Sequence, residues 1–444
     1  MNQQNDCMQK TAVSIVRKLN QAGHIAYFAG GCVRDFLMNQ IPKDYDIATN
    51  ATPDEVEKLF SKTVPVGKQF GVMLVIEENM SFEVATFRQE GEYRDGRHPS
   101  EVRFTSPEED AKRRDFTING LFYDPIKQEI IDYVEGRTDI KKRIIKTIGN
   151  PEARFREDKL RLLRAVRFAN NLGFSIEPTT WEAIKAMKTE IQSVSQERVR
   201  DELIKLFTRK NAGDGLMLLS DSGLLAEILP EADAMKGVEQ PPEFHPEGDV
   251  FIHTKLLMDK LENPSVSLAF GALLHDIGKP AAYSNENGKI RFYSHSRVGC
   301  EIAEKMLKRL RFSNKEIDQI LSCVDNHMKF AKVKEMREGK LKQFITRHNF
   351  LEELELHRID CESSHGMLDN YFFLKDKLTE YEKENLKPKP LLNGNDIIIL
   401  GHRPGPLIKE ILEQVYVLQL EGKWPNKDEA LQWVRQKYPL PKAV

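Results

Sequence analysis

The stretch Gly30-Gly31-Cys32-Val33-Arg34-Asp35, followed shortly by Asp44-Tyr45-Asp46-Ile47, decides the fold of the N-terminal part of this chain. A glycine pair after the apolar run at 25–29 lets backbone amides approach a phosphate closely, because no Cβ stands in the way. Side chains alternate faces along an extended strand, so Asp44 and Asp46 are expected to project from one side and to hold a divalent cation. The sequence predicts a site where metal and phosphate meet.

A third carboxylate is expected beside this pair. Glu83 lies between two apolar residues, at a position where a half-buried strand would otherwise carry no acid. The apolar runs at 72–76 and 82–87 predict a hairpin that brings Glu83 beside the two aspartates. Three clustered acids repel one another unless a cation lies between them, so the cluster favours a metal site over an exposed strand end.

Composition bounds the class of protein. The chain has 444 residues, 40% hydrophobic and 30% charged, as is typical of a globular protein with several domains. A net charge of -2 gives no overall attraction to polyanions, so a nucleic-acid contact needs a local basic patch. The segment 137–167 carries eleven Lys or Arg against four acids and is one candidate, although a solvated helix face has the same composition. The candidate RNA contacts are Arg88, Lys141, Lys142 and Arg143.

The cysteines and the apolar runs indicate the cellular compartment. Five scattered cysteines without a C-x-x-C pair predict neither a disulfide framework nor a zinc knuckle, which fits a reducing cytoplasm. The first residues lack the basic and apolar regions of a signal peptide, and no apolar run approaches the length of a membrane span. We therefore expect a cytoplasmic protein with no membrane partner.

The pattern along the chain divides it into three parts. A helix is expected at 8–22, and strands and turns then dominate to about residue 133, as in a small α/β head. From Pro151 the pattern is helical, with a core-facing helix after Glu157 that ends at Gly173. The stretch 230–248 has the composition of a linker, and mostly helical sequence follows it. The predicted domains are 1–150, 151–245 and 246–444.

Four groups of residues carry a resemblance to a known family. They are the opening stretch with its two aspartates, Arg113-Arg114-Asp115, Glu157-Asp158-Lys159-Leu160-Arg161, and Glu197-Arg198-Val199-Arg200. In this order they resemble the bacterial tRNA nucleotidyltransferase and poly(A) polymerase family, the class II branch of the polymerase-beta-like nucleotidyltransferases. The resemblance implies a multidomain α+β protein with a small α/β nucleotidyltransferase head, an all-α neck and body, and an all-α C-terminal domain. It also implies transfer of nucleotides to an RNA 3′ hydroxyl by two Mg²⁺ ions.

The resemblance assigns residues to the nucleotide. Asp44 and Asp46 would hold Mg²⁺, with Glu83 as the candidate third carboxylate from its place in the predicted hairpin, and Arg114 and Asp115 are similar to the family's ribose-recognition motif. Cytosine and adenine present an amino donor beside a ring-nitrogen acceptor, which an Asp and an Arg one helical turn apart can read. Asp158 and Arg161 are the expected pair, although an intrahelical salt bridge would have the same spacing. The full expected nucleotide-binding set is Gly30, Gly31, Arg34, Asp35, Arg114, Asp115, Asp158, Arg161 and Arg164.

The identity of the added nucleotides is open at this point. The segment Arg88–Pro99 resembles a flexible loop that CC-adding relatives lack, which argues against addition of CC alone. Addition of CCA to a tRNA 3′ end from CTP and ATP is the first expectation, and A addition is the second. A poly(A) polymerase is less favoured, because such relatives tend to carry strongly basic extensions.

A second group of ligand-type residues lies in the C-terminal half. His253, His275-Asp276, His295, His327 and Asp360 resemble the metal site of the HD-superfamily phosphohydrolases. Imidazole and carboxylate ligands suit a divalent transition metal, and burying a His-Asp pair in an apolar run without a ligand is costly. The resemblance implies phosphodiesterase or phosphatase activity on RNA ends, and a scaffold that only binds metal is the alternative. The sequence does not predict the oligomeric state.

Overall fold

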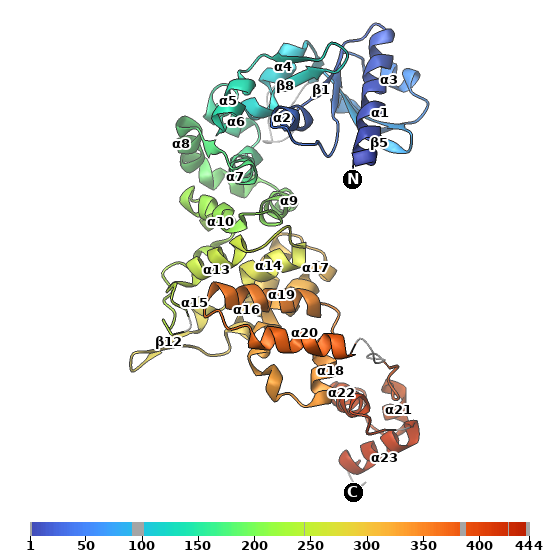
Figure 1. Ribbon diagram of the computed structural model, residues 1–444, viewed down its shortest axis with the longest axis vertical. Coiled ribbons are helices and arrows are strands. Elements are labelled where there is room, and N and C mark those ends of the chain that lie inside the picture. Colours follow the sequence, from blue (N-terminus) through green and yellow to red (C-terminus); the bar gives the residue numbers. More distant parts are fainter. Residues whose placement is uncertain (1, 91–101, 244, 382–387, 425, 441–444) are drawn as a thin grey trace. The chain divides into compact units, whose positions relative to one another are not determined.

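The computed structural model describes residues 2–90, 102–243, 245–381, 388–424 and 426–440 (Figure 1). The chain divides into two compact units, Met1–Asp233 and Ala234–Val444. Among the described residues, no helix combines the length and the apolar character that crossing a bilayer needs.

A mixed seven-stranded sheet forms the head of the first unit. Its spatial order is β3 (Thr63–Gly67), β4 (Val72–Glu77), β5 (Met80–Thr86), β2 (Ile47–Thr49), β1 (Ala26–Ala29), β8 (Leu121–Asp124) and β9 (Glu129–Asp132). Strands β2 and β5 run parallel, and every other neighbouring pair is antiparallel. The expected α/β head is confirmed, including a β4–β5 hairpin that pairs Leu74 with Glu83. Residues Arg88–Glu90 (β6) and Val102–Phe104 (β7) form a separate ribbon.

Helices close the edges and faces of this head. They are α1 (Asn2–Gln21), α2 (Gly31–Leu37), α3 (Pro53–Leu59), α4 (Pro107–Lys112), α5 (Gly136–Lys142) and two 3₁₀ turns, η1 (Lys68–Phe70) and η2 (Thr117–Asn119). Helix α1 begins earlier than the sequence pattern indicates and buries Ile15, Val16 and Leu19 completely. Figure 1 shows α2 beside β1 and β8, which it contacts directly. This packing places the start of α2 at the end of β1.

The rest of the first unit is helical, as expected. Its elements are β10 (Ile144–Ile145), α6 (Pro151–Glu157), α7 (Leu160–Leu172), β11 (Ser175–Ile176), α8 (Pro178–Met187), η3 (Lys188–Ser193), α9 (Gln196–Phe207), α10 (Ala212–Asp221), α11 (Leu224–Ile228) and α12 (Pro230–Asp233). Helix α7 ends at Gly173, whose φ of 63° is the left-handed conformation that glycine adopts at low cost. Its apolar stripe packs on α9 and α10, so α7 is the central helix of this region.

The second unit is mostly helical, with one hairpin that the sequence pattern did not predict. Its elements are α13 (Val250–Asp259), α14 (Val266–Leu274), α15 (Lys279–Ala282), β12 (Tyr283–Glu286), β13 (Lys289–Phe292), α16 (His295–Arg309), α17 (Asn314–Asn326), η4 (His327–Glu335), α18 (Glu338–Ile345), α19 (Phe350–Ser363), α20 (Asp369–Tyr381), α21 (Gly394–Ile399), α22 (Pro406–Leu420) and α23 (Lys427–Lys437). Helix α14 is buried nearly all round and packs on α13, α17 and α19.

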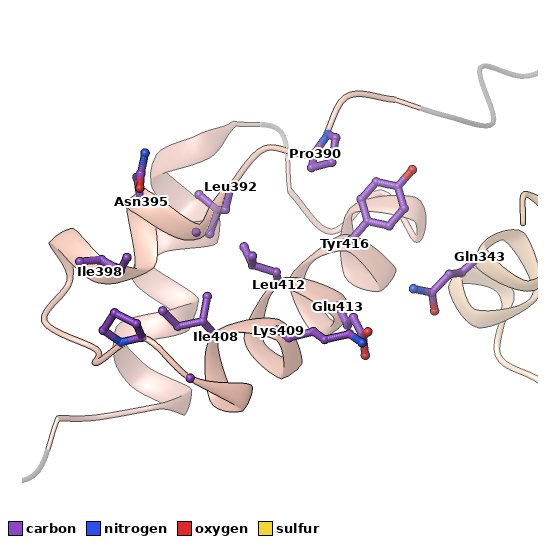
Figure 2. Close-up of a pocket in the computed structure, with 13 residues that line it drawn as sticks. Gln343, Pro390, Leu392, Asn395, Ile398, Ile408, Lys409, Leu412, Glu413 and Tyr416 are labelled. Carbon is purple, nitrogen blue, oxygen red and sulfur yellow. The ribbon is translucent and has the colours of Figure 1, made fainter. Parts of the chain in front are cut away.

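A mainly apolar, open hollow of about 540 Å³ lies along the last helices (Figure 2). Leu392, Ile408 and Leu412 line it, and Tyr416 and Gln343 lie at its other side in the view of Figure 2. Leu392 and Ile408 also belong to the core that joins α21, α22 and α23. The hollow thus borders the small core of these helices.

Candidate functional site

The two aspartates of the opening stretch lie in the extended segment that leads into β2. Asp44 and Asp46 are exposed, whereas Tyr45 and Ile47 are buried, so the side chains alternate as in a strand. The ring of Tyr45 packs against Phe28, with 5.2 Å between ring centroids. This buried ring fixes the segment and directs both carboxylates to the same side.

Glu83 lies beside these aspartates. In the parallel β2–β5 pair Ile47 is opposite Val84, so the preceding residues, Asp46 and Glu83, are also neighbours. Both Asp46 and Glu83 are exposed, while the residues on either side of Glu83 are buried. Desolvation of the carboxylate by the surrounding protein and the charges of Asp44 and Glu83 raise the pKa of Asp46 to about 6. The charge of Arg114 acts in the opposite direction. Because the ionised carboxylates repel one another, a cation bound between them would stabilise the site.

The glycine pair forms the turn between β1 and α2. Gly30 has φ 70° and ψ -124°, a conformation that residues with a side chain rarely adopt. A Cβ on Gly30 would lie 3.0 Å from Nη1 of Arg114, so the turn also needs space. Next to it, Arg34 donates to Oδ1 of Asp35 at 2.7 Å and to Oδ1 of Asn119 at 2.8 Å. The turn therefore lies beside Arg114, whose charge acts on Asp46.

A buried acid that the sequence analysis missed, Asp110, binds both arginines of the Arg113-Arg114-Asp115 motif. Asp110 on α4 is 2% exposed and accepts hydrogen bonds from Arg113 at 2.8 Å and from Arg114 at 3.1 Å. Burial raises the pKa of Asp110, but the charges of Arg113 and Arg114 lower it by more, so the net shift is downward. Spacings of three and four residues on one helix could have revealed these pairs.

Asp115 joins the head to helix α7. It is buried and accepts hydrogen bonds from Nη2 of Arg164 at 2.6 Å and from Nδ2 of Asn119 at 3.2 Å. Burial raises the pKa of Asp115, but Arg164 and Arg161 outweigh that effect and hold the pKa at about 2. Asn119, which the sequence analysis also missed, thereby links Asp115 to Arg34.

Replacing Asp115 by Asn is expected to lower the free energy of unfolding at pH 7 by about 3 kcal/mol, because it removes the carboxylate that lies closest to the Arg164 guanidinium and leaves only the more distant Glu202. The pKa of Asp115 is lower in the folded chain, so its contribution is present above the unfolded pKa of about 3.9 and is lost as the pH falls toward 2. Urea unfolding of both forms tests this. Asp201→Asn, which removes an exposed partner of Arg200, is the control and should change stability by less than about 0.5 kcal/mol.

Contrary to the sequence analysis, Asp158 and Arg161 do not lie on one helix. Helix α6 ends at Glu157 and α7 begins at Leu160, so Asp158 lies at the junction with φ -143°. Asp158 accepts a hydrogen bond from Nη2 of Arg198 on α9 at 2.7 Å. Arg161 is 8% exposed and donates to Oε2 of Glu157 at 2.5 Å and to the Arg113 carbonyl at 3.2 Å. Each member of the pair therefore has its own partner, and no salt bridge joins them.

The candidate RNA contacts lie in two places. Lys141, Lys142 and Arg143 are exposed at the end of α5, where Arg143 also donates to the Gly173 carbonyl at 3.3 Å. Arg88 donates to the backbone carbonyl of Phe70 and thus stabilises the start of the β6–β7 ribbon. Residues 91–99 of the loop that the sequence analysis singled out lie outside the described part of the chain.

The six ligand-type residues of the second unit come together in a buried cluster. The ligand atoms of His253, His275 and Asp360 lie close enough together to hold one metal ion. Those of Asp276, His295 and His327 do the same. The histidines of the second group lie with their Nε2 atoms 3.0 Å apart.

Backbone carbonyls orient three of these imidazoles. The Nδ1 atoms of His275, His295 and His327 each lie 2.7–2.9 Å from the carbonyl three residues earlier. Such contacts put the proton on Nδ1 and leave Nε2 free as a ligand atom. The buried Nε2 of His275 lies 3.2 Å from Oδ2 of Asp276, in reach of a shared metal ion. Burial lowers the pKa of His327 to about 4, so this imidazole is neutral. The residues fit a divalent transition metal.

Asp276 lies between the two groups. Its Oδ2 is 3.2 Å from Nε2 of His275, and its Oδ1 is 3.6 Å and 3.7 Å from Nε2 of His295 and His327. The buried Lys279 lies 2.7 Å from Oδ2 and lowers the pKa of Asp276 despite its burial. Asp276 is therefore an ionised carboxylate that faces both groups.

His245 and Glu247 belong to the same cluster, and the sequence analysis missed them. Oε1 of Glu247 lies 2.7 Å from Nδ1 of His253 and 2.9 Å from Nδ1 of His245. On its other side, Nε2 of His253 lies 3.0 Å from Oδ1 of Asp360. Both missed residues fall in the stretch 230–248, so the interpretation of that whole stretch as a linker is wrong.

Glu247→Gln is expected to weaken metal binding in the second unit by about tenfold or more, because Glu247 orients the His253 imidazole toward the ligand group. Competition for Mn²⁺ with a chelator measures this. Glu239→Gln, an exposed acid in the same stretch, should bind Mn²⁺ like the unmodified chain. Equal affinity of the Glu247→Gln form and the unmodified chain would contradict this role for Glu247.

Comparisons with known proteins assign three parts of the chain to family models. Residues 26–146 match the poly A polymerase head domain, 173–236 match the probable RNA and SrmB-binding site of polymerase A, and 249–361 match the HD domain. The fold and the site thus define a nucleotidyltransferase head with an RNA-binding region and an HD domain, an architecture that implies metal dependence.

Full-length relatives narrow this class. A CCA-adding enzyme of Bacillus subtilis is 33% identical over 436 residues, which cover 96% of this chain and 97% of the relative. That of Staphylococcus haemolyticus is 32% identical over 432 residues, with 96% and 97% coverage. The crystal structure of the Bacillus stearothermophilus CCA-adding enzyme in complex with CTP is 29% identical, covers 96% of both chains and superposes with a TM-score of 0.73. The chain belongs to the CCA-adding enzymes, the tRNA nucleotidyltransferases.

Proposed function

We propose that this chain adds CMP, CMP and AMP in turn to the 3′ end of tRNA, using CTP and ATP and releasing pyrophosphate. The observation that carries the proposal is the meeting of Asp44, Asp46 and Glu83 beside the Gly30 turn. A relative with 29% identity over nearly the whole chain has been crystallised with CTP, which supports the choice of substrate.

Asp44, Asp46 and Glu83 would hold two Mg²⁺ ions. When bound, these ions lower the pKa of the attacking 3′ hydroxyl and neutralise the leaving pyrophosphate. The narrow Gly30 turn lets the triphosphate approach the backbone, and Arg34 and Arg114 supply positive charge beside it. Asp115 holds Arg164 and Asn119 in place and can accept a hydrogen bond from the ribose.

Asp158 and Arg161 would select the base. The Asp158 carboxylate accepts from the amino group that cytosine and adenine share, and Arg161 donates to the neighbouring ring nitrogen. Their present partners are Arg198 and Glu157, so base binding would replace or share these contacts. Uracil and guanine present a carbonyl and an N–H at the same positions and would leave both side chains unsatisfied.

Nucleotide selectivity tests the proposal. We expect the chain to extend tRNA with CTP and ATP and to reject UTP and GTP. Arg161→Ala should lower incorporation of the correct nucleotides and reduce the preference over UTP. Arg156→Ala removes the same charge from the exposed face of α6, where Arg156 pairs with Glu152, and should behave like the unmodified chain. Unchanged selectivity in Arg161→Ala would contradict the assigned role.

The pH dependence of Mg²⁺ binding follows from Asp46. Its pKa of about 6 means that a proton competes with the metal below that pH. We expect the Mg²⁺ concentration needed for half-maximal nucleotide addition to rise about tenfold for each pH unit below 6 and to level off above 7. Steady-state rates measured from pH 5 to 8 at several Mg²⁺ concentrations test this, and a flat profile would contradict it.

A second activity, hydrolysis of a phosphate ester, is supported by the cluster in the second unit. A cavity of about 740 Å³ opens onto His295, His327 and Asp360, so a substrate can reach the ligand groups. A divalent transition metal held there supplies an activated water at neutral pH. Release of phosphate in the presence of Mn²⁺, Co²⁺ or Ni²⁺ tests this activity.

A further inference from the structure

The cavity beside the metal-binding cluster has a lining that the cluster itself does not explain. Its volume of about 740 Å³ is within the range of small-molecule sites. Beyond the ligand residues, its walls come from the β12–β13 hairpin, from η4 and from the end of α19. The chemistry of these walls indicates which molecule fits.

Two cations in the lining are available for an anion. Arg291 of the hairpin and Lys334 of η4 are exposed, and neither forms an ion pair with a carboxylate in the described part of the chain. Arg291 donates to the hydroxyl of Tyr293 and lies 5.6 Å from the centre of that ring. Lys279, in contrast, already neutralises Asp276 and donates to the buried Gln240. Unpaired Arg and Lys beside metal ligands are typical of phosphate recognition.

Exposed apolar side chains surround the same cavity. Tyr293 is 58% exposed, Met328 is 51% exposed and Met367 is 56% exposed. An aromatic face offers stacking to any nucleobase, and methionine sulfur makes favourable contacts with aromatic rings. One further carboxylate in the lining, Asp369, can accept a hydrogen bond from a sugar hydroxyl. The cavity thus combines charge for a phosphate with surface for a flat ring.

We propose that Arg291, Lys334 and Tyr293 form a binding subsite for a nucleotide. In this subsite the two cations hold the phosphate next to the metal ligands, and the ring of Tyr293 stacks on the base. This inference rests on the proposed phosphate-ester hydrolysis in one respect only, namely that the reacting phosphate lies at the metal ligands. A free mononucleotide and the last nucleotide of an RNA chain offer the same chemistry.

Binding to the full chain in the presence of Mn²⁺ tests the subsite. The probes are uridine 3′-monophosphate and a uridine trinucleotide with a 3′-phosphate, measured by isothermal titration calorimetry. Arg291→Ala and Tyr293→Ala should each raise Kd at least about fivefold, whereas Tyr293→Phe keeps the ring and should stay close to the unmodified chain. All substitutions lie in the second unit, so binding to the head contributes equally to every form. Mn²⁺ content should be the same in all of them.

Lys289→Ala is the matched control. Lys289 lies on the same strand, β13, carries the same charge as Arg291 and does not line the cavity. An equal loss of binding in Lys289→Ala, or unchanged binding in Arg291→Ala and Tyr293→Ala, would overturn the subsite. Absence of binding of both probes to the unmodified chain would also overturn it. Binding without phosphate release would support the subsite and reject the hydrolytic activity. Tighter binding of one probe identifies the source of the nucleotide, a free molecule or an RNA end.

Discussion

Asp46→Asn is expected to reduce nucleotide addition by at least about a thousandfold, because a carboxylate that holds the catalytic metal contributes several kcal/mol to the transition state. The Asp46→Asn substitution should not lower the free energy of unfolding. The surroundings of Asp46 and its acidic neighbours raise its pKa to about 6, so the ionised group disfavours the metal-free fold at neutral pH. Single-turnover addition of AMP to a CC-ended tRNA measures the rate, and thermal unfolding without metal measures the stability.

Glu129→Gln is the control for this substitution. Glu129 is an exposed acid on β9, a strand separated from β2 by β1 and β8. Its replacement should leave both the rate and the melting temperature unchanged. A rate for Asp46→Asn within tenfold of the unmodified chain would show that the carboxylates at the β2–β5 pair are not the metal site of the head.

Asp276→Asn is expected to abolish metal binding in the second unit and any phosphate release there, while nucleotide addition continues. Asp276 faces both ligand groups, so its loss affects each of them. It also neutralises the buried Lys279, so this variant could fail to fold. His295→Ala removes a ligand from one group without removing the partner of Lys279, and it should also lose phosphate release.

Metal content after dialysis, phosphate release and nucleotide addition are measured on the same preparations of these two variants. Loss of nucleotide addition in a folded Asp276→Asn or His295→Ala chain would show that the two sites are not independent. Full metal content in both variants would show that this cluster is not the metal site of the second unit.

Sequence periodicity was sufficient to predict that Asp46 and Glu83 lie side by side, because the signal there is local. Alternation along the segment that leads into β2 and along β5 places Asp46 and Glu83 on one face, and the β4–β5 hairpin needs only neighbouring residues. The buried His-Asp pair in the second unit was detectable for the same reason, since two polar residues interrupt an apolar run.

Tertiary contacts explain what the sequence analysis missed. The spacing of Asp158 and Arg161 fits one helical turn, but the chain breaks at Asp158 and the carboxylate pairs with Arg198 on another helix. Asn119 joins Asp115 to Arg34, which is 85 residues away in the sequence, so only the folded head reveals this contact. The segment of Glu247 has the Pro and acid content of a linker, and only folding places it against His253.

The most direct test of the central claim uses three tRNA transcripts, ending at the discriminator base, at the first C and at CC. The purified chain is incubated with Mg²⁺ and each transcript, with CTP and ATP supplied separately and together. We predict addition of C, C and A to the shortest transcript, and completion of the other two. Addition of A to the CC-ended transcript alone would contradict CCA addition and would make this chain an A-adding enzyme.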